Sequence, residues 1–279
     1  MNYITVGKEN STNINLYYED HGTGKPVVLI HGWPLSGASW EKQLPALLDA
    51  GYRVITYDRR GFGNSGRPTT GYDYDTLAAD LNKLMTQLDL REATLVGFSM
   101  GGGEVARYLG VFGSERVSKA VFMAAIPPFL LKRADNPEGV DGTVFDGIKL
   151  GIIADRPAFL TSFLTNFYNV DDNVGKRLSE EVIRLSWNIA AGASPIGTLA
   201  CVSAWLTDFR EDLKRIDVPT LVIHGDADRI LPLDATGKRI IEYVKGSRLV
   251  VISGGPHGLN WTHAEQVNRD LLEFLGKGE

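Results

Sequence analysis

The stretch of sequence at residues 93–112 reads ATLVGFSMGGGEVARYLGVF. Its first part, residues 93–98, is a short apolar run typical of a buried strand, and residues 102–112 fit a helix. The turn between them matches the pattern G-x-S-x-G, in which a serine lies at a sharp junction of strand and helix. Flanking glycines relieve the crowding of such a turn. This context predicts that Ser99 is a nucleophile presented at the carboxyl end of a strand.

Similar apolar runs recur on both sides of this stretch. They are rich in β-branched residues and occupy residues 26–31, 52–58, 119–124, 219–224 and 247–252. Helical spacing of apolar residues lies between or after them, at residues 39–50, 74–90 and 261–275. Short continuous runs suit parallel strands that are buried on both faces. Their alternation with helices predicts an α/β fold, a mostly parallel sheet with helices on both sides. Residues 13–20 are typical of an antiparallel hairpin that leads into this sheet.

The pattern changes after Pro127. Residues 132–142 are polar and turn-rich, which is typical of a loop. From residue 144 to residue 216 the strand signal is weak, and helical runs carry aromatic side chains. We therefore predict one α/β domain, made of residues 1–127 and 217–279, that is interrupted by a helical cap insertion at residues 128–216.

The composition limits the partners of the chain. The 279 residues are 43% apolar, which is enough for a sizeable core. Lys and Arg number 29 and Asp and Glu number 34, so the formal charge is −5, and we expect neither nucleic acid nor an anionic membrane as a partner. The single cysteine, Cys201, excludes an intramolecular disulfide and a zinc site built on several thiolates.

The sequence carries no recognisable targeting signal. The N-terminus lacks a basic start followed by an apolar run, so no signal peptide is predicted. The longest apolar run, residues 120–131, contains two prolines and falls short of the ~20 residues that a spanning helix needs. We expect a cytoplasmic protein.

A serine hydroxyl needs a base to act as a nucleophile, and histidine is the usual one. The five histidines are His21, His31, His224, His257 and His263. His31 and His224 follow buried strands, where they line the site or stabilise loops. His263 lies in the sequence Thr-His-Ala-Glu, which fits a capping box and places it at the first helical position. His257 lies in a Gly-Gly-Pro-His-Gly loop directly after the last strand, so we predict that it is the base.

The base in turn needs a carboxylate that fixes its tautomer and stabilises the imidazolium. Asp226 and Asp228 both follow the apolar run at residues 219–224. Either one gives the chain order serine, aspartate, histidine that is typical of hydrolases with a nucleophile elbow. Spacing along the sequence leaves both open.

An oxyanion formed during attack by Ser99 requires amide donors. The backbone N–H of Met100, the residue after the nucleophile, is the first donor that we predict. The second is the amide of Trp33, because Gly32 lets the chain turn closely after the strand at residues 26–31. Pro34 has no N–H and cannot donate.

One further motif, residues 61–66, matches G-x-G-x-x-G after a strand. A dinucleotide site requires a helix that begins directly at this motif, but residues 67–71 continue as a loop. We therefore predict no nucleotide cofactor here. Metal-binding and P-loop patterns are also missing from the sequence, and we predict no metal.

Together these motifs resemble the α/β-hydrolase fold, and more narrowly the branch of cofactor-free haloperoxidases (perhydrolases) and bacterial arylesterases. The resemblance rests on residues 16–37, 51–65, 71–81, 95–108, 216–232 and 254–268. It implies a triad of Ser99, Asp228 and His257, an oxyanion hole formed by the Trp33 and Met100 amides, and a helical cap. It also implies esterase or amidase turnover together with perhydrolysis of carboxylic acids.

The resemblance implies a small ester or carboxylic acid as substrate, with hydrogen peroxide as co-substrate, and a homo-oligomer. Pro34 follows the oxyanion-hole residue, as in the perhydrolases, whereas Trp33 and the triple glycine at residues 101–103 look like the arylesterases. Apolar side chains are expected to contact the substrate, and the candidates are Trp33, Ile126, Phe129, Phe159, Phe163, Trp205 and Ile230.

Three other functions remain open on this sequence. The same triad could cleave amides, including γ-lactams, or could act as a base in a cyanohydrin lyase. A hydrolase scaffold can also bind a ligand without catalysis. Haloalkane dehalogenases and epoxide hydrolases are excluded, because they need a carboxylate at the position of Ser99.

Overall fold

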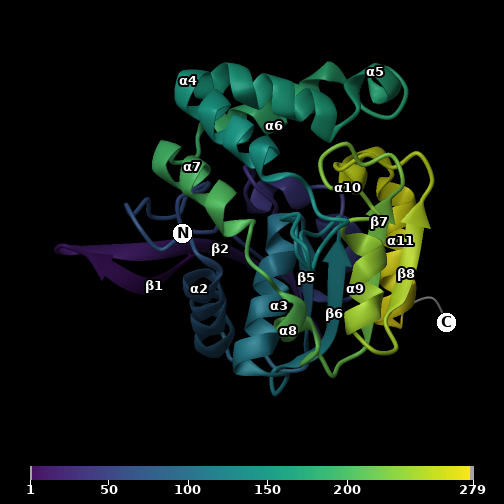
Figure 1. Cartoon of the computed structure of the whole chain (residues 1–279). Coiled ribbons are helices and arrows are strands. Elements are labelled where there is room, and N and C mark those ends of the chain that lie inside the picture. The colour runs from purple at the N-terminus through teal and green to yellow at the C-terminus, as the bar shows by residue number, and fades with distance from the viewer. Residues whose placement is uncertain (1, 277–279) are drawn as a thin grey trace.

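The computed structural model describes residues 2–276, in which one eight-stranded sheet forms the centre of the molecule (Figure 1). Its strand order is β1-β2-β4-β3-β5-β6-β7-β8. β1 pairs antiparallel with β2, and β2 pairs antiparallel with β4. The strands β4, β3, β5, β6, β7 and β8 run parallel to one another. The strands are β1 (Asn2–Glu9), β2 (Thr12–His21), β3 (Pro26–Ile30), β4 (Arg53–Tyr57), β5 (Ala93–Phe98), β6 (Val117–Met123), β7 (Thr220–Gly225) and β8 (Arg248–Ile252).

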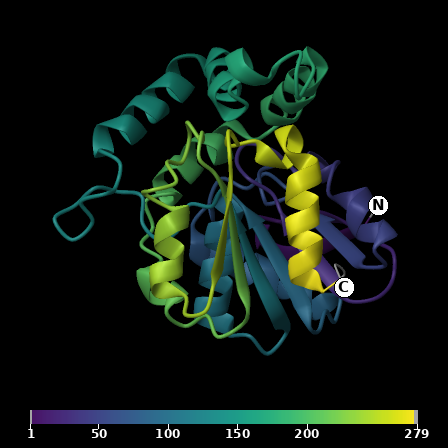
Figure 2. The same ribbon diagram turned by 90° about the vertical axis from the view of Figure 1, so that its right-hand side faces the viewer.

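Helices cover both faces of this sheet. Figure 2 shows α11 on one face and α9 on the opposite face. The helix α3 packs against α2 and α8 on the same side as α9. The helices outside the segment between β6 and β7 are the 3₁₀ helix η1 (Gly37–Trp40), α1 (Leu44–Asp49), α2 (Tyr74–Gln87), α3 (Met100–Phe112), α9 (Gly237–Tyr243), α10 (Leu259–Thr262) and α11 (Ala264–Leu275). The predicted α/β fold with helices on both sides of a mostly parallel sheet is confirmed.

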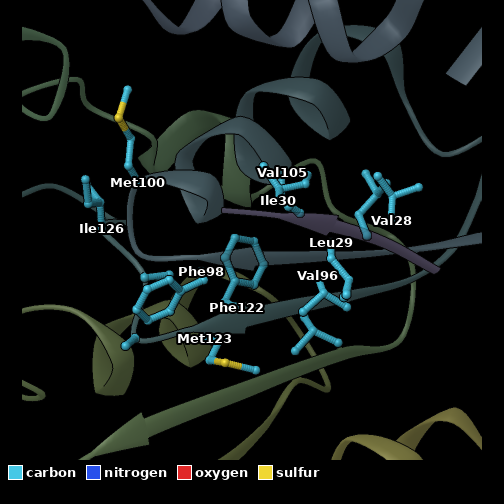
Figure 3. Packing of buried hydrophobic residues seen from close by; sticks show 14 of the residues in the cluster. Val28, Leu29, Ile30, Val96, Phe98, Met100, Val105, Phe122, Met123 and Ile126 are labelled. Atoms are coloured by element: carbon cyan, nitrogen blue, oxygen red, sulfur yellow. The ribbon is translucent and has the colours of Figure 1, made fainter. Parts of the chain in front are cut away.

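The core lies where the central strands meet these helices (Figure 3). Every residue of β3, β5 and β7 is buried, as expected for parallel strands covered on both faces. Leu29, Val96 and Phe122 come from neighbouring strands and are fully buried there. This packing fixes the carboxyl ends of β3, β5 and β6 beside one another.

The segment between β6 and β7 is helical, and Figure 1 shows α4 to α7 lying over one edge of the sheet. Its helices are α4 (Gly142–Phe167), α5 (Val170–Asn173), α6 (Glu180–Ala191), α7 (Pro195–Ala204) and α8 (Arg210–Leu213). The Phe209 amide donates to the Pro128 carbonyl oxygen over 2.9 Å, which ties together the two ends of residues 129–208. Of these helices, α4 to α7 lie within residues 129–208, which we call the helical segment.

Two predicted helices differ from the structure. Residues 39–50 form η1 and the short α1 instead of one helix, and Pro45 lies in the first turn of α1, where a missing N–H is tolerated. Residues 261–275 are interrupted at His263, whose backbone is not helical. The prediction that His263 takes the first helical position is wrong, because Thr262 bonds to the His263 ring and to Gly258 instead of capping α11.

Within residues 2–276, none of the helices combines the length and the apolar character that a membrane crossing requires.

Candidate active site

Ser99 lies at the junction of β5 and α3, at the carboxyl edge of the sheet. Its backbone has φ 54° and ψ −116°, a region that residues with a side chain rarely adopt. Two backbone hydrogen bonds hold it there: the Ser99 amide donates to the Met123 carbonyl over 2.9 Å, and the Ile126 amide donates to the Ser99 carbonyl over 3.2 Å. The strained turn is therefore anchored to the end of β6.

The glycines around this serine allow a close approach of backbone to backbone. A Cβ atom on Gly97 would overlap the Gly101 carbonyl, and one on Gly101 would overlap the carbonyl oxygen of Ile30. Hence α3 begins directly against the end of β3. The G-x-S-x-G pattern is required here by the packing of the strand-to-helix turn.

His257 reaches this serine from the loop that follows β8. Its Nε2 atom lies 2.9 Å from the Ser99 Oγ, and its Nδ1 atom lies 2.7 Å from Asp228 Oδ2. The ring is fully buried and packs against Phe98 and Phe167, with centroid distances of 5.2 and 5.0 Å. Aromatic packing and two hydrogen bonds thus fix its orientation.

Asp228 lies on the turn after β7. Its Oδ1 atom accepts hydrogen bonds from the amides of Ile230 and Leu231, both over 2.8 Å. Burial alone would raise the pKa of Asp228, but the charge of His257 and the hydrogen bonds from His224 and His257 outweigh it and hold the pKa well below its usual range. The carboxylate is therefore ionised next to the His257 ring.

Asp226, the other aspartate of this turn, faces elsewhere. Its Oδ1 atom accepts a hydrogen bond from the Gly254 amide over 2.6 Å, which links the turn after β7 to the loop after β8. The structure thus places Asp228, and not Asp226, against the predicted base.

The two amides predicted as oxyanion donors come from the loop after β3 and from the start of α3. A Cβ atom on Gly32 would lie 3.0 Å from Ser99 Cβ, so the loop that carries Trp33 passes directly beside the serine. Within residues 2–276, the backbone N–H groups of Trp33 and Met100 donate to no protein acceptor. The Trp33–Pro34 peptide bond is cis, and the Trp33 indole donates to the Thr198 carbonyl over 3.1 Å.

A small cavity of about 50 Å³ opens beside Ser99, between the sheet edge and the helical segment. Apart from Ser99, its lining is apolar and consists of Trp33, Ile126, Leu130, Phe145, Phe163, Trp205, Ile230 and Leu231. Five of the seven predicted substrate-contact residues are among them.

Phe129 and Phe159 lie outside the lining of this cavity. Phe129 is buried and stacks under the Arg210 guanidinium, while Phe159 packs on Phe163 and on Trp33. The sequence reasoning missed Leu130, Phe145 and Leu231. Aliphatic residues and single aromatics of this kind carry no signal in the sequence that separates a cavity wall from ordinary core.

The remaining histidines have other surroundings. His31 is fully buried at the end of β3, where Nδ1 lies 2.9 Å from the Gly32 carbonyl oxygen and Nε2 accepts from the Arg59 amide over 3.0 Å. His224 is fully buried at the end of β7, with Nε2 2.9 Å from the Leu231 carbonyl oxygen. His21 is partly exposed beside Glu19. None of these three contacts Ser99.

A buried ion pair between Arg59 and Glu104 lies next to the loop that follows β3. Glu104 of α3 is fully buried and pairs with the Arg59 guanidinium, and Tyr57 also donates to Glu104. The Arg59 Nη2 group donates to the carbonyl oxygen of His31 over 2.7 Å. The helix that follows Ser99 is thus connected through Arg59 to the loop of Trp33.

The G-x-G-x-x-G stretch of the sequence does not lead directly into a helix. Residues 61–66 form turns after β4, where Asn64 donates its amide to Asp58 over 2.7 Å, and the next helix begins only at Tyr74. Among residues 2–276, no group of three or more His, Cys, Asp or Glu side chains is arranged so that it could hold a metal ion.

Comparison with known proteins places this geometry among related chains. The family model described as "alpha/beta hydrolase fold" matches residues 25–264. A protein of Synechocystis sp. named "Putative non-heme chloroperoxidase" is 66% identical over 99% of this chain and 100% of its own length. The "Bifunctional esterase/perhydrolase DCH" of Acinetobacter calcoaceticus is 35% identical, over 99% of both chains.

A solved structure agrees with these relatives. The crystal structure of a bromoperoxidase from Bacillus anthracis superimposes with a TM-score of 0.95 at 54% identity, covering 98% of this chain and 99% of the other. The likeness therefore extends over the sheet, the helical segment and the loops that carry Ser99, Asp228 and His257.

Proposed function

We propose that this chain, which belongs to the alpha/beta hydrolase fold family, is a serine esterase and perhydrolase that works through an acyl-enzyme on Ser99. One observation carries the proposal: a continuous chain of hydrogen bonds runs from Ser99 Oγ through His257 to Asp228, over 2.9 and 2.7 Å, beside a buried apolar cavity. The esterase, perhydrolase and haloperoxidase names of the relatives support the same chemistry.

In the acylation step, the Ser99 oxygen attacks the carbonyl carbon of an ester while His257 Nε2 takes the hydroxyl proton. Asp228 stays ionised and stabilises the imidazolium that forms. The amides of Trp33 and Met100 donate to the oxyanion, and His257 then gives its proton to the departing alcohol. Removing one such donor typically costs about 3 kcal/mol of barrier.

Deacylation requires a small nucleophile. His257 removes a proton from water or from hydrogen peroxide, whose oxygen attacks the acyl carbon, and Ser99 leaves with the proton. Water gives a carboxylic acid, and peroxide gives a peracid. A peracid released into solution transfers one oxygen atom to a halide and becomes the carboxylic acid, which accounts for haloperoxidase activity.

The cavity favours short acyl groups. At about 50 Å³ it holds about three or four water-sized groups, and its walls are apolar. We expect acetyl and propionyl esters to be turned over faster than octanoyl esters. An aryl leaving group fits the aromatic side chains Trp33, Phe163 and Trp205.

We also propose the domain division of the sequence, with residues 128–216 as a cap on a catalytic domain of residues 1–127 and 217–279. Two observations support it: the hydrogen bond between Phe209 and Pro128 closes the helical segment at its base, and Phe163 and Trp205 of that segment form part of the cavity wall.

Covalent labelling tests the proposed nucleophile. An aryl fluorophosphonate should add one phosphonyl group per chain, and peptide mass spectrometry should locate it on Ser99. Ser99→Ala is the control and should show neither labelling nor turnover of p-nitrophenyl acetate. Labelling of another residue, or turnover by the alanine variant, would contradict the proposal.

A rate comparison tests the perhydrolase half. The purified protein should release p-nitrophenol from its acetate. With acetate, hydrogen peroxide and bromide it should form peracetic acid, which oxidises bromide to hypobromite and returns to acetic acid, and the hypobromite should brominate monochlorodimedone. Both activities should disappear together in Ser99→Ala. Ester turnover without peracid formation would reduce the proposal to an esterase.

A further inference from the structure

The carboxylate of Asp228 has a second histidine beside it. His224 is fully buried at the end of β7, and its Nε2 atom lies 3.2 Å from Asp228 Oδ2. The same Nε2 atom lies 2.9 Å from the carbonyl oxygen of Leu231. Thus Asp228 Oδ2 faces two imidazole rings, that of His257 on one side and that of His224 on the other.

The neighbours of His224 determine where its proton lies. A carbonyl oxygen accepts hydrogen bonds only, and so does an ionised carboxylate. Both groups around Nε2 are therefore acceptors, and Nε2 must carry the proton and donate it. By contrast, Nδ1 of His224 is buried and has no hydrogen-bond partner within residues 2–276.

The backbone of Gly237 lies close to Nδ1. Gly237, at the start of α9, faces the ring so closely that a Cβ atom there would lie 2.6 Å from Nδ1. The glycine thus fills the space next to Nδ1 with backbone only. This contact holds the ring in the orientation that directs Nε2 at Asp228 and Leu231.

The turn that carries Asp228 is closed by these contacts. Its Oδ1 atom accepts from the amides of Ile230 and Leu231, while His224 bonds to the Leu231 carbonyl. With His224 and His257 at Oδ2, both carboxylate oxygens have two donors each. A carboxylate that is fully supplied with donors is stabilised in its ionised form.

The other charged groups near Asp228 pair with residues other than Asp228. The groups that shift the pKa of Asp228 are His257 and His224. Arg229, the next residue, pairs with Asp171 and Asp172 of α5, and Asp226 bonds to the Gly254 amide. From α9, Arg239 reaches Asn136.

We propose that His224 is a positioning residue for the triad acid: its Nε2–H fixes the Asp228 carboxylate opposite His257 and keeps it ionised. The proposal rests on the proposed function, since it assigns His224 a part in the work of Ser99 and His257. It predicts that the loss of this donor changes the pH dependence of the reaction as well as its rate.

Two substitutions separate the donor from the ring. His224→Gln keeps an N–H at the distance of Nε2, whereas His224→Leu removes it. For His224→Leu, we expect kcat/KM on p-nitrophenyl acetate to fall by about 10- to 100-fold. The acid limb of its pH profile should move to higher pH, because an Asp228 carboxylate that lacks one donor is a stronger hydrogen-bond acceptor for the protonated ring opposite it. His224→Gln should stay within about threefold of the parent, with the limb unmoved.

His263→Gln is the matched control, since this histidine is also buried near the loop of His257 but bonds to Thr262 instead of Asp228. Its acid limb should not move. A purely structural role for His224 would lower activity at all pH values without moving the limb in His224→Leu, and that result would overturn the proposal.

A measurement on the unaltered protein tests the proposed donor role of His224 even if His224→Leu does not fold. Two-bond ¹H–¹⁵N correlation spectra at neutral pH should show the His224 proton on Nε2. A proton on Nδ1 with a bare Nε2 would overturn the proposal. Phosphonate labelling of Ser99 in the same sample keeps the two hypotheses apart: labelled protein with the wrong His224 tautomer contradicts only the role of His224, and unlabelled protein contradicts the proposed function.

Discussion

His31 is a buried histidine whose charge state affects the stability of the whole chain. Burial and the nearby Arg59 guanidinium both lower its pKa, which lies well below the usual range in the folded protein. In the unfolded chain the ring takes up a proton near pH 6.5. The unfolded state therefore binds more protons below this pH, and the folded state loses stability as the pH falls.

We expect His31→Gln to remove this pH dependence. In the parent protein, His31 should lower the free energy of unfolding by up to about 1.4 kcal/mol for each pH unit below ~6.5. Urea unfolding between pH 5 and 7.5 measures the slope in parent and variant. His21→Gln changes a partly exposed histidine and should keep the parental slope. Parallel slopes for His31→Gln and the parent would contradict the prediction.

The pair of Arg59 and Glu104 leads to a second prediction about single residues. Both side chains are fully buried, so Glu104→Gln leaves an uncompensated guanidinium inside the protein. We expect a loss of about 3–5 kcal/mol in the free energy of unfolding. Lys238→Gln breaks the exposed pair with Asp234 and should cost at most about 1 kcal/mol. Equal losses in the two variants would show that the buried pair contributes no more to the free energy of unfolding than the exposed pair.

At this scale a motif in the sequence indicates Ser99 and a loop position indicates His257, and the structure brings the two side chains within 2.9 Å of each other. The choice between Asp226 and Asp228 did not follow from spacing. It depends on which carboxylate faces His257 across the sheet edge, and the structure directs Asp226 to the Gly254 amide. The contact between His224 and Asp228 could not be predicted either, since it depends on the shape of the turn.

The junction of β5 and α3 provides a prediction about an element. In Gly101→Ala, the added Cβ would overlap the carbonyl oxygen of Ile30, so α3 must move away from β3. We expect the variant to lose stability, and its labelling by a fluorophosphonate at Ser99 to slow by more than about tenfold, since the amides that we propose as oxyanion donors are displaced.

Gly147→Ala is the same substitution at a helical position where the added methyl group has free space. Gly147 lies inside α4, and a Cβ atom there meets nothing within 4 Å. Because alanine favours the helix, this variant should gain about 0.5–1 kcal/mol in the free energy of unfolding. If Gly147→Ala lost stability as Gly101→Ala does, the close approach of Gly101 to Ile30 would not be the cause of the loss.

Parallel strands were the elements best predicted from the sequence, and residues 93–98 form β5 with the predicted bounds. The continuous apolar runs of β3, β5 and β7 reflect burial on both faces, which leaves little ambiguity. The same prediction is wrong for β8, which is the edge strand of the sheet and is mostly half-buried or exposed. The helices near loops were predicted less well. Pro45 and the side-chain bonds of Thr262 interrupt residues 39–50 and 261–275, and such local interactions compete with helical periodicity.

For the molecule as a whole, the thiol of Cys201 reports on opening of the helical segment. It lies on α7 and is fully buried, and burial raises its pKa to about 12. We expect no reaction with 5,5′-dithiobis(2-nitrobenzoate) in native buffer and one thiol per chain in urea. Fast reaction in native buffer would mean that α7 leaves the sheet edge without global unfolding.

The position of the cavity is a property of the whole molecule, and the sequence predicted it only in part. Trp33, Phe163 and Ile230 come from three distant parts of the chain, and they meet only because the helical segment lies over the sheet edge. Phe129 and Phe159 have the same apolar character but face elsewhere. The predicted homo-oligomer remains a prediction, which light scattering of the purified protein can test.

The hydrogen bond from Phe209 to Pro128 has a consequence for engineering. Because the two ends of the helical segment lie next to each other at this hydrogen bond, the segment can be exchanged as a unit. A chimera that receives the corresponding stretch of a related hydrolase would keep Ser99, Asp228 and His257 on their original scaffold. Grafts of this kind offer a route to enzymes that differ in selectivity and share the same three side chains at the sheet edge.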